Sequence, residues 1–241
     1  MIKEINVSNG FENYSQRNNK ISPSTSCGPT NMIQAAEYAG YNVYSIDMFP
    51  ELTQPEDKLT KFTRTDPKVL EYYEVQFPNE YKAWIKEANN IKGEKEIWEV
   101  NTIKAYPPNE IHAVMNYATR LFFNNQAMTR FSTITEEVLI DNLISGLPVV
   151  CTVRFGGFGH YVTVVGITYD ERKFKVNKNP IYIKDYIIDN TYGRFNFKTN
   201  KYDNVSGNNE HIERKHFLNM LQPLNSSKIY AHTFTRGVAT I

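Results

Sequence analysis

The chain has 241 residues, of which 41% are hydrophobic and 22% charged, and its 27 basic and 26 acidic side chains give a formal net charge of +1. This composition is typical of a soluble globular protein and excludes a disordered or fibrous chain. The nearly balanced charge provides no basic patch for nucleic acid or for an anionic membrane. The length fits one large domain, with or without an insertion.

The N-terminal sequence MIKEINVSNGFENYSQ contains no apolar core of a secretory signal, and nowhere do eighteen apolar residues follow one another. We therefore expect synthesis in the cytoplasm without a signal peptide, and no membrane insertion. The two cysteines, Cys27 and Cys151, are too few for the disulfide framework of a small secreted scaffold. We do not expect them to form a bridge with one another.

The first predicted helix begins at about Cys27 and ends at Gly40. Pro29 suits the first turn of a helix, and Gly40 suits the left-handed position that follows one. Between them, apolar residues recur at helical spacing: Met32, Ile33, Ala35, Ala36 and Ala39.

The region from 47 to 130 is charged and aromatic, and we interpret it as a mainly helical insertion or lobe, broken by the two prolines at 107–108. Within and after it, the apolar spacing predicts helices in 109–127 and in 133–145. Thr135 is a plausible cap for the second of these.

After Gly146 the apolar spacing changes from helical to extended. A predicted helix at about 210–221 interrupts the later part of this extended region. The predicted strands are rich in β-branched residues, and they concentrate the sheet in the C-terminal half: LPVVCTVRF, HYVTVVGITYD, PIYIKDYIIDN and KIYAHTFTR.

Cys27 is the candidate nucleophile, because the start of a helix offers unpaired N–H groups and a positive dipole end that favour a thiolate. The alternative is a small buried residue without chemistry, which is common for a lone cysteine. His160 lies 133 residues after Cys27, close to the separation of roughly 130 to 150 residues between a papain-type nucleophile and its partners.

Three sequence segments resemble motifs of a known family. STSCGPTNMIQAAEYAG resembles the active-site helix of the C39-like branch of papain-like cysteine peptidases, in which Cys-Gly-Pro opens the helix. GLPVVCTVRFGGFGHYVTVVGITYD is similar to that family's second motif, with His160 at the base position. YIIDNTYG is similar to its third, acidic motif. The three motifs occur in the family's order.

The resemblance covers most of the chain except about 47–130. It implies an α+β, papain-like cysteine peptidase fold over residues 1–241, a single catalytic domain. In that fold an N-terminal helical lobe carries the nucleophile helix and packs on a C-terminal antiparallel β-sheet. It further implies Cys27 as nucleophile, His160 as general base and no cofactor.

The third motif leaves open which residue orients the ring of His160. Matching the family's acid selects Asp189, whereas matching the following glycine without a gap selects Asn190. Successive strand residues point to opposite faces, so only one of the two can serve. Asp189 is slightly favoured, and a papain-type Asn190 is chemically acceptable.

For the oxyanion hole, the family uses an upstream glutamine together with the backbone N–H of the nucleophile. Gln16 is the only glutamine before Cys27, and it lies 11 residues upstream, farther than is usual in the family. The alternative interpretation is a solvated loop residue.

Other residues are interpreted as structural. Cys151 lies in an apolar strand and reads as core packing. The glycine loop at 156–159 is expected to turn tightly and to leave space beside His160. Tyr161 and Tyr192 adjoin the site motifs and could contact substrate. The remaining histidines lack metal-ligand spacing, so no metal site is expected: His112, His211, His216 and His232.

The resemblance implies a cysteine peptidase or amidase that works through an acyl-Cys27 intermediate. Stand-alone phage members of the family resemble endolysins, which a holin releases to cut the peptide part of peptidoglycan. We therefore expect a peptidoglycan stem peptide, or another peptide, as the substrate, with release to the cell wall during host lysis. Two alternatives stay open: a transglutaminase-like acyltransferase with the same dyad, and a catalytically silent papain-fold binding protein. The motifs do not define the oligomeric state.

Overall fold

The computed structural model describes most of the chain, namely residues 1–8, 11, 14–90, 105–155, 158–177, 180–203, 205–223 and 226–237. The helices of this part are, in chain order, η1 (Gln16–Asn18), α1 (Cys27–Tyr38), η2 (Val43–Ser45), α2 (Pro55–Thr65), α3 (Pro67–Gln76), α4 (Pro78–Asn90), η4 (Pro108–Glu110), α5 (His112–Phe122), α6 (Glu136–Ile144), α7 (Glu171–Asn177), η5 (Pro180–Tyr182) and α8 (Arg214–Met220). The strands are β1 (Ile2–Asn6), β2 (Thr129–Ile134), β3 (Val149–Phe155), β4 (Phe158–Asp170), β5 (Ile183–Asn190), β6 (Phe195–Asn196), β7 (Lys201–Tyr202), β8 (Gly207–Glu213) and β9 (Ile229–Phe234).

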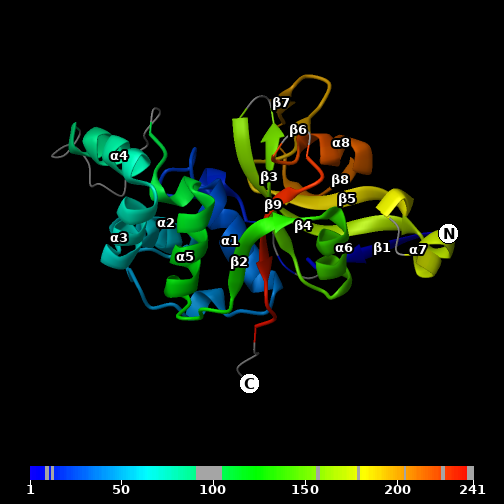
Figure 1. Cartoon of the computed structure of the whole chain (residues 1–241), viewed down its shortest axis with the longest axis horizontal. Helices are drawn as coiled ribbons and strands as arrows, with labels where there is room; N and C mark the ends of the chain where they lie inside the picture. The colour runs from blue at the N-terminus through cyan, green and yellow to red at the C-terminus, as the bar shows by residue number, and fades with distance from the viewer. Residues whose placement is uncertain are drawn as a thin grey trace.

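Seven strands form one antiparallel sheet in the spatial order β2-β9-β3-β4-β5-β8, with β1 added beside β4. The long strand β4 is the centre of this sheet: β3 pairs with its first half and β1 with its second half, while β5 runs along its other edge. In Figure 1 the sheet lies on one side of α1, and α2 to α5 lie on the other. The chain therefore has the α+β architecture that its sequence predicts.

Helix α1 is the connection between the two halves. Ten of its twelve residues are buried, which an otherwise solvent-facing helix would not show. Gly40, just past its end, has a φ of +92°, as the left-handed position after a helix requires. Both predicted ends of this helix are confirmed to within two residues.

Two apolar clusters pack on the two faces of the sheet. One gathers α6, α8 and the inward side chains of β3, β4 and β5, including Cys151. The other joins α1 to α2, α3, α4 and α5, and it also takes in Val150, Tyr161 and Phe234 from the sheet. Neighbouring residues of β4 thus serve different clusters, because successive side chains of a strand point to opposite faces.

In the described part of residues 47–130 most residues lie in helices, and the helix α4 there ends at Asn90. Residues 91–104 of this region lie outside the described part. The helix predicted in 109–127 is α5, and the helix predicted in 133–145 is α6. Thr135 caps α6, because its hydroxyl accepts the backbone N–H of Val138 at 3.4 Å.

Strands are not predicted from the sequence at β1, β2, β6, β7 or β8. β1 and β2 lie outside the region where the sequence concentrates the sheet, and both pair along their full length, with β4 and β9 respectively. The helix predicted at about 210–221 is shorter: β8 occupies Gly207–Glu213, and α8 begins only at Arg214. Alternating burial along β8 marks it as a strand that pairs with β5.

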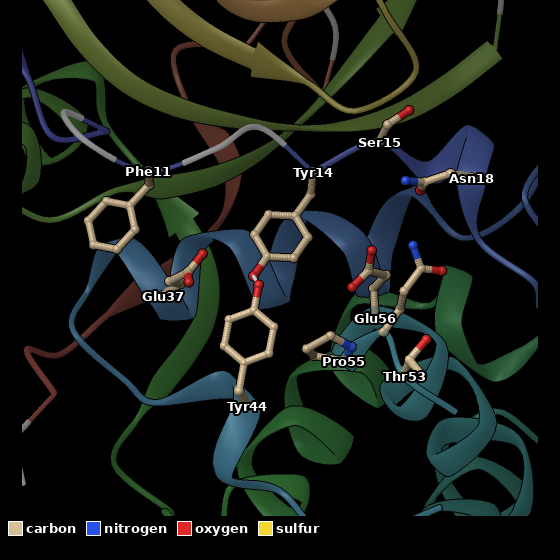
Figure 2. A pocket seen from close by; sticks show the side chains of 10 residues that line it. Phe11, Tyr14, Ser15, Asn18, Glu37, Tyr44, Thr53, Pro55 and Glu56 are labelled. Carbon is tan, nitrogen blue, oxygen red and sulfur yellow. Dashed lines mark hydrogen bonds between the residues drawn. The ribbon is translucent and has the colours of Figure 1, made fainter. Parts of the chain in front are cut away.

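Phe11 lies beside the end of α1, where its ring is centred 5.3 Å from that of Tyr38. There the hydroxyl of Tyr14 lies 3.0 Å from that of Tyr44 in η2, as Figure 2 shows. Of the helices described, none is both long and apolar enough to cross a membrane.

Candidate active site

The thiol of Cys27 lies at the first residue of α1, half-buried and unbridged, since both cysteines are free. Burial raises the pKa of the Cys27 thiol to about 12, and the negative charge of Glu110 adds to this rise. The nearby backbone N–H groups of Tyr161, Gly28 and Cys27 itself act in the opposite direction and lower this pKa. Because Tyr161 directly follows His160, this proximity places the thiol against the backbone of the predicted base.

His160 lies near the start of β4 and is only 7% exposed. Its Nε2 is 3.0 Å from Oδ1 of Asn190 at the end of β5. A carboxamide oxygen only accepts, so this bond fixes the ring tautomer with the proton on Nε2 and leaves Nδ1 as a proton acceptor. Burial lowers the pKa of His160 to about 4, although the bond to Asn190 opposes that shift.

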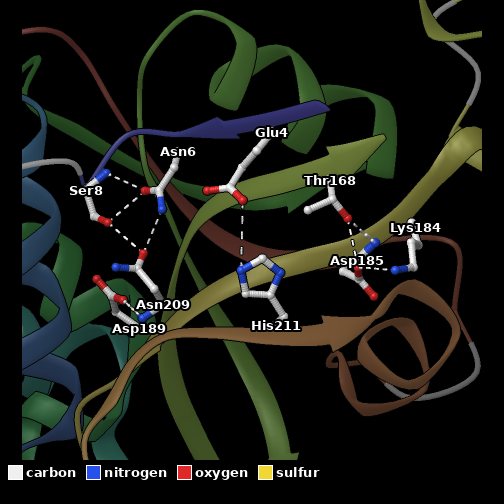
Figure 3. Close-up of polar contacts among 9 residues, drawn as sticks. All are labelled: Glu4, Asn6, Ser8, Thr168, Lys184, Asp185, Asp189, Asn209 and His211. Atoms are coloured by element: carbon white, nitrogen blue, oxygen red, sulfur yellow. Dashed lines mark hydrogen bonds and ion pairs between the residues drawn. The ribbon is translucent and has the colours of Figure 1, made fainter. Parts of the chain in front are cut away.

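Asp189 does not hold the ring, contrary to the slight preference from sequence. It points to the opposite face of β5, where its carboxylate accepts the Tyr38 hydroxyl at 2.8 Å and the Asn209 backbone N–H at 2.7 Å. Figure 3 shows Asp189 beside Asn209, which in turn bonds Asn6 and Ser8. Asp189 therefore ties β5 to α1 and β8, and Asn190 is the residue that contacts His160.

Asn31, on the second turn of α1, was not singled out from the sequence. Its fully buried amide donates to the carbonyl of Cys27 at 2.8 Å, to the carbonyl of Tyr161 at 3.0 Å and to the hydroxyl of Thr191 at 3.1 Å. It thus connects the nucleophile to the residues that follow His160 and Asn190. A polar residue four positions after the nucleophile, on the same helical face, is the only sequence signal for this role.

Gln16 is 1% exposed and so is not the solvated loop residue of the alternative interpretation. Its Nε2 donates to the carbonyl of Pro23 at 2.9 Å, and its Oε1 accepts the Thr191 hydroxyl at 3.0 Å. The structure brings Gln16 into the same network as Asn31, three hydrogen bonds from the Cys27 carbonyl. An amide nitrogen has two N–H groups, so one remains beyond the bond to Pro23.

Aromatic rings cover His160. The ring of Tyr202, on the short strand β7, is centred 6.0 Å from the imidazole, and that of Tyr192 is 6.4 Å away. Arg17 lies 4.6 Å from the centre of the Tyr192 ring, on the side of η1. Tyr202 was missed from the sequence because the hairpin of β6 and β7 brings it back over β4 from 42 residues downstream. This cover explains the burial of His160.

The helical lobe meets the nucleophile through η4. A Cβ atom at Gly28 would lie 2.6 Å from the carbonyl oxygen of Asn109, so only glycine allows this approach. The buried Arg64 donates to the side chain of Asn109 at 2.8 Å. Burial raises the pKa of the neighbouring Glu110 to about 7, while Arg64 lowers it.

The predicted glycine loop is only partly described, since residues 156 and 157 lie outside the described part. At Gly159 a Cβ atom would find nothing within 4 Å, which indicates open space just before His160. Within the described ranges, no group of three or more histidine, cysteine, aspartate or glutamate side chains is placed to hold a metal ion. The side chains that the structure gathers around Cys27 and His160 include a thiol, an imidazole and the carboxamide of Asn190.

A helix-borne cysteine set against a sheet-borne histidine and asparagine defines a papain-like protein of α+β class. The sequence matches the Peptidase_C39 like family over residues 8–209, and the chain belongs to this family of cysteine peptidases. A search of solved structures found the crystal structure of a protein assigned as a C39-like peptidase from Bacillus anthracis. The two share 14% identity over 98% of each chain with a TM-score of 0.51, so this likeness concerns the fold. A search of curated proteins found no match.

Proposed function

We propose that the chain is an active cysteine peptidase in which Cys27 is the nucleophile and His160 the general acid and base. Two observations carry the proposal. Asn190 Oδ1 binds Nε2 of the His160 ring, and the backbone N–H of the next residue, Tyr161, lies near enough to the Cys27 sulfur to lower its pKa. Those contacts leave Nδ1 of the ring as the acceptor for the thiol proton.

The reaction begins from a neutral thiol and a neutral imidazole, since burial disfavours the charged form of each. This differs from the thiolate–imidazolium pair that the helix position alone suggests. As the sulfur attacks the scissile carbonyl carbon, its proton moves to His160 Nδ1 and the carbonyl oxygen becomes an oxyanion. The C–N bond then breaks, and His160 protonates the leaving amine.

The resulting acyl-Cys27 thioester is hydrolysed by water, from which His160 takes a proton. The carboxylic acid product leaves, and the thiol is regenerated. We propose that the oxyanion is stabilised by the backbone N–H of Cys27 and by the second amide N–H of Gln16. Asn190 keeps the imidazole in one tautomer through both halves of the reaction.

For the substrate we propose the peptide part of bacterial peptidoglycan. This inference is supported by the resemblance to stand-alone, endolysin-type members of the family. In that role the protein would act on the cell wall once released, as a phage endolysin does. Residues 47–130 would contribute to the substrate cleft through η4, where Asn109 and Glu110 adjoin Gly28 and the thiol.

The test compares the release of new amino groups from purified bacterial peptidoglycan by wild type, Cys27→Ala and Cys151→Ala at neutral pH. Cys151 provides the matched control, because it is a free cysteine buried in β3 on the other face of the sheet. We expect release by wild type and Cys151→Ala and none by Cys27→Ala.

A parallel assay uses an unfolded protein and a peptide library in place of peptidoglycan. Cleavage of peptides without release of amino groups from peptidoglycan would support the peptidase activity and contradict the cell-wall substrate. Inactivity of the wild type toward both kinds of substrate would reject the proposal and favour the acyltransferase or the silent binding protein.

A further inference from the structure

A pocket lies between Phe11 and Tyr14 of the N-terminal segment, the end of α1 and the start of α2, with a volume of about 410 Å³. Pockets of this size suit a small ligand. Tyr14, Tyr44, Glu37 and Glu56 are among the side chains that line it, and Figure 2 shows them around the opening. Glu37 is ten residues from Cys27 along α1, or about 15 Å at the rise of an α-helix. The pocket lining includes neither Cys27 nor His160.

Glu56 is the unusual group in this pocket. It is 3% exposed, and its Oε2 has no hydrogen-bond partner among the described residues. The next residue, Asp57, is by contrast fully used, because its two oxygens accept the backbone N–H groups of Lys20 and Ile21 at 3.0 and 2.9 Å. A buried acceptor without a donor costs free energy. In Figure 2 the carboxyl group of Glu56 points toward the side of the pocket where Tyr14 lies.

The charges around this carboxyl group are of one sign. Burial raises the pKa of Glu56 to about 7, and the acidic groups Asp57 and Glu37 add to the rise. The described side chains that line the pocket include both Glu37 and Glu56 but no lysine, arginine or histidine. A cation that entered would therefore meet two carboxylates and no competing positive charge.

The remaining lining favours an organic cation over a metal ion. The aromatic rings of Phe11, Tyr14 and Tyr44 line the same space, and aromatic faces attract an ammonium group and cover an aliphatic chain. The linked hydroxyls of Tyr14 and Tyr44, 3.0 Å apart, offer further acceptors for N–H groups. An ammonium has three N–H donors, and so it can satisfy Glu56 Oε2 together with a tyrosine hydroxyl.

We propose that this pocket binds a primary ammonium group carried on a short aliphatic chain, with Glu56 as its principal partner and Glu37 as a second carboxylate. A free diamine and the side chain of a lysine residue share this chemistry. The proposal does not depend on the activity of Cys27, because neither Cys27 nor His160 is among the residues that line the pocket.

The test is calorimetric titration of the full chain at pH 8 with cadaverine and, separately, with 1,5-pentanediol, which has the same length without the charge. We expect saturable binding of cadaverine only. Glu56→Gln keeps the shape of the side chain, and it should weaken cadaverine binding about tenfold or more. Glu37→Gln should weaken it by a smaller factor.

Glu51→Gln is the matched control, since Glu51 is exposed, pairs with Lys61 and lies outside the pocket; its affinity should equal that of wild type. Thermal unfolding of each variant verifies that it is folded. Equal binding of diol and diamine, or wild-type affinity in Glu56→Gln, would overturn the proposal. Titration with Nα-acetyl-lysine amide then separates the sources: binding as tight as that of cadaverine identifies a lysine side chain, and weaker binding identifies a free diamine.

Discussion

The side chain of Asn31 donates a hydrogen bond of 3.0 Å to the backbone carbonyl of Tyr161, which joins α1 to β4 at the candidate site. The same nitrogen also reaches the carbonyl of Cys27 and the hydroxyl of Thr191. Three segments that are far apart in the sequence are thus held by one buried amide. This amide therefore helps to hold Cys27 in place relative to the strand that carries His160.

Asn31→Ala should therefore reduce both stability and activity. It removes the donor to Tyr161 and the acceptor for the Thr163 hydroxyl, which lies 2.8 Å from Asn31 Oδ1. Buried groups left without partners cost about 1–3 kcal/mol each. We expect the free energy of unfolding in urea to fall by about 2–4 kcal/mol, and kcat to fall more than KM changes.

The control for this change is Asn142→Ala on α6, where the amide bonds only an exposed helical carbonyl, that of Val138. That variant should keep wild-type kcat and nearly wild-type stability. A folded Asn31→Ala protein with normal kcat would contradict the positioning role.

Asn190 and Asp189 should separate activity from stability. Asn190→Ala removes the acceptor for His160 Nε2, so the ring loses its preferred tautomer, and we expect kcat to fall about 10²-fold. Asp189→Asn removes a carboxylate that accepts from Tyr38 and Asn209, and we expect lower stability with kcat within a few fold of wild type. Steady-state kinetics and urea unfolding on both variants give the comparison. The reverse pattern would restore Asp189 as the orienting residue.

The pH dependence of kcat/KM should show an unusually acidic lower limb. The general base must be neutral, and burial lowers the pKa of His160 to about 4. A lowered pKa keeps the imidazole neutral at every pH above that value, so activity should rise through about pH 4 and remain at pH 5. An ordinary histidine would be mostly protonated at that pH. A limb near pH 6.5 would show that the ring is solvated in the working enzyme.

The sequence predicts the two reacting residues because each lies in a segment with clear secondary-structure signals. Cys27 opens a helix with Pro29 in its first turn, and the β-branched run after His160 can only be a strand in this context. The choice between Asp189 and Asn190 depends instead on which face of β5 each occupies. The pairing of β5 with β8 is irregular between Ile188 and Asn190, and such a register shift follows from tertiary packing that no local pattern records.

The contacts of Asn31 and Tyr202 are equally hidden from the sequence. Asn31 makes its contacts across the interface between α1 and the sheet. Tyr202 reaches His160 because the hairpin of β6 and β7 folds back over the site. Gln16 is an intermediate case, since its residue type suggested a role and its burial could be learned only from the fold. Strands β1 and β2 are short, and their own residue pattern does not predict a strand. They are extended because they pair with β4 and β9.

Gly28→Ala should be far more damaging than Gly159→Ala, although both glycines adjoin a reacting residue. The methyl group at position 28 would lie 2.6 Å from the Asn109 carbonyl oxygen, which belongs to the backbone and cannot simply rotate away. We expect a loss of about 1–3 kcal/mol in the free energy of unfolding and a displaced thiol. At Gly159 the methyl group would meet nothing within 4 Å, and the stability should be unchanged. Equal unfolding midpoints for the two variants would contradict the close packing of η4 on α1.

Glu56→Gln should stabilise the protein increasingly as the pH rises. The pKa of Glu56 is 4.5 in an ordinary setting and about 7 in the folded chain, so between these values the folded state holds a proton that the unfolded state has released. Raising the pH through this window therefore destabilises the wild type, by at most about 3 kcal/mol. The glutamine variant lacks this titration. Its advantage in urea unfolding should be absent at pH 4 and largest at pH 8.

The acidic neighbours Asp57 and Glu37 and the tyrosines Tyr14 and Tyr44 are present in both proteins, so their titrations largely cancel in the difference. Glu51→Gln again serves as the control: the pKa of Glu51 is lowered by its hydrogen bond to Lys61, so its removal should bring no gain at high pH. Saturating cadaverine should remove most of the advantage of Glu56→Gln at pH 8, because the bound ammonium stabilises the ionised carboxylate of the wild type. Parallel stability curves for wild type and variant would mean that Glu56 is solvated and that its carboxylate needs no partner.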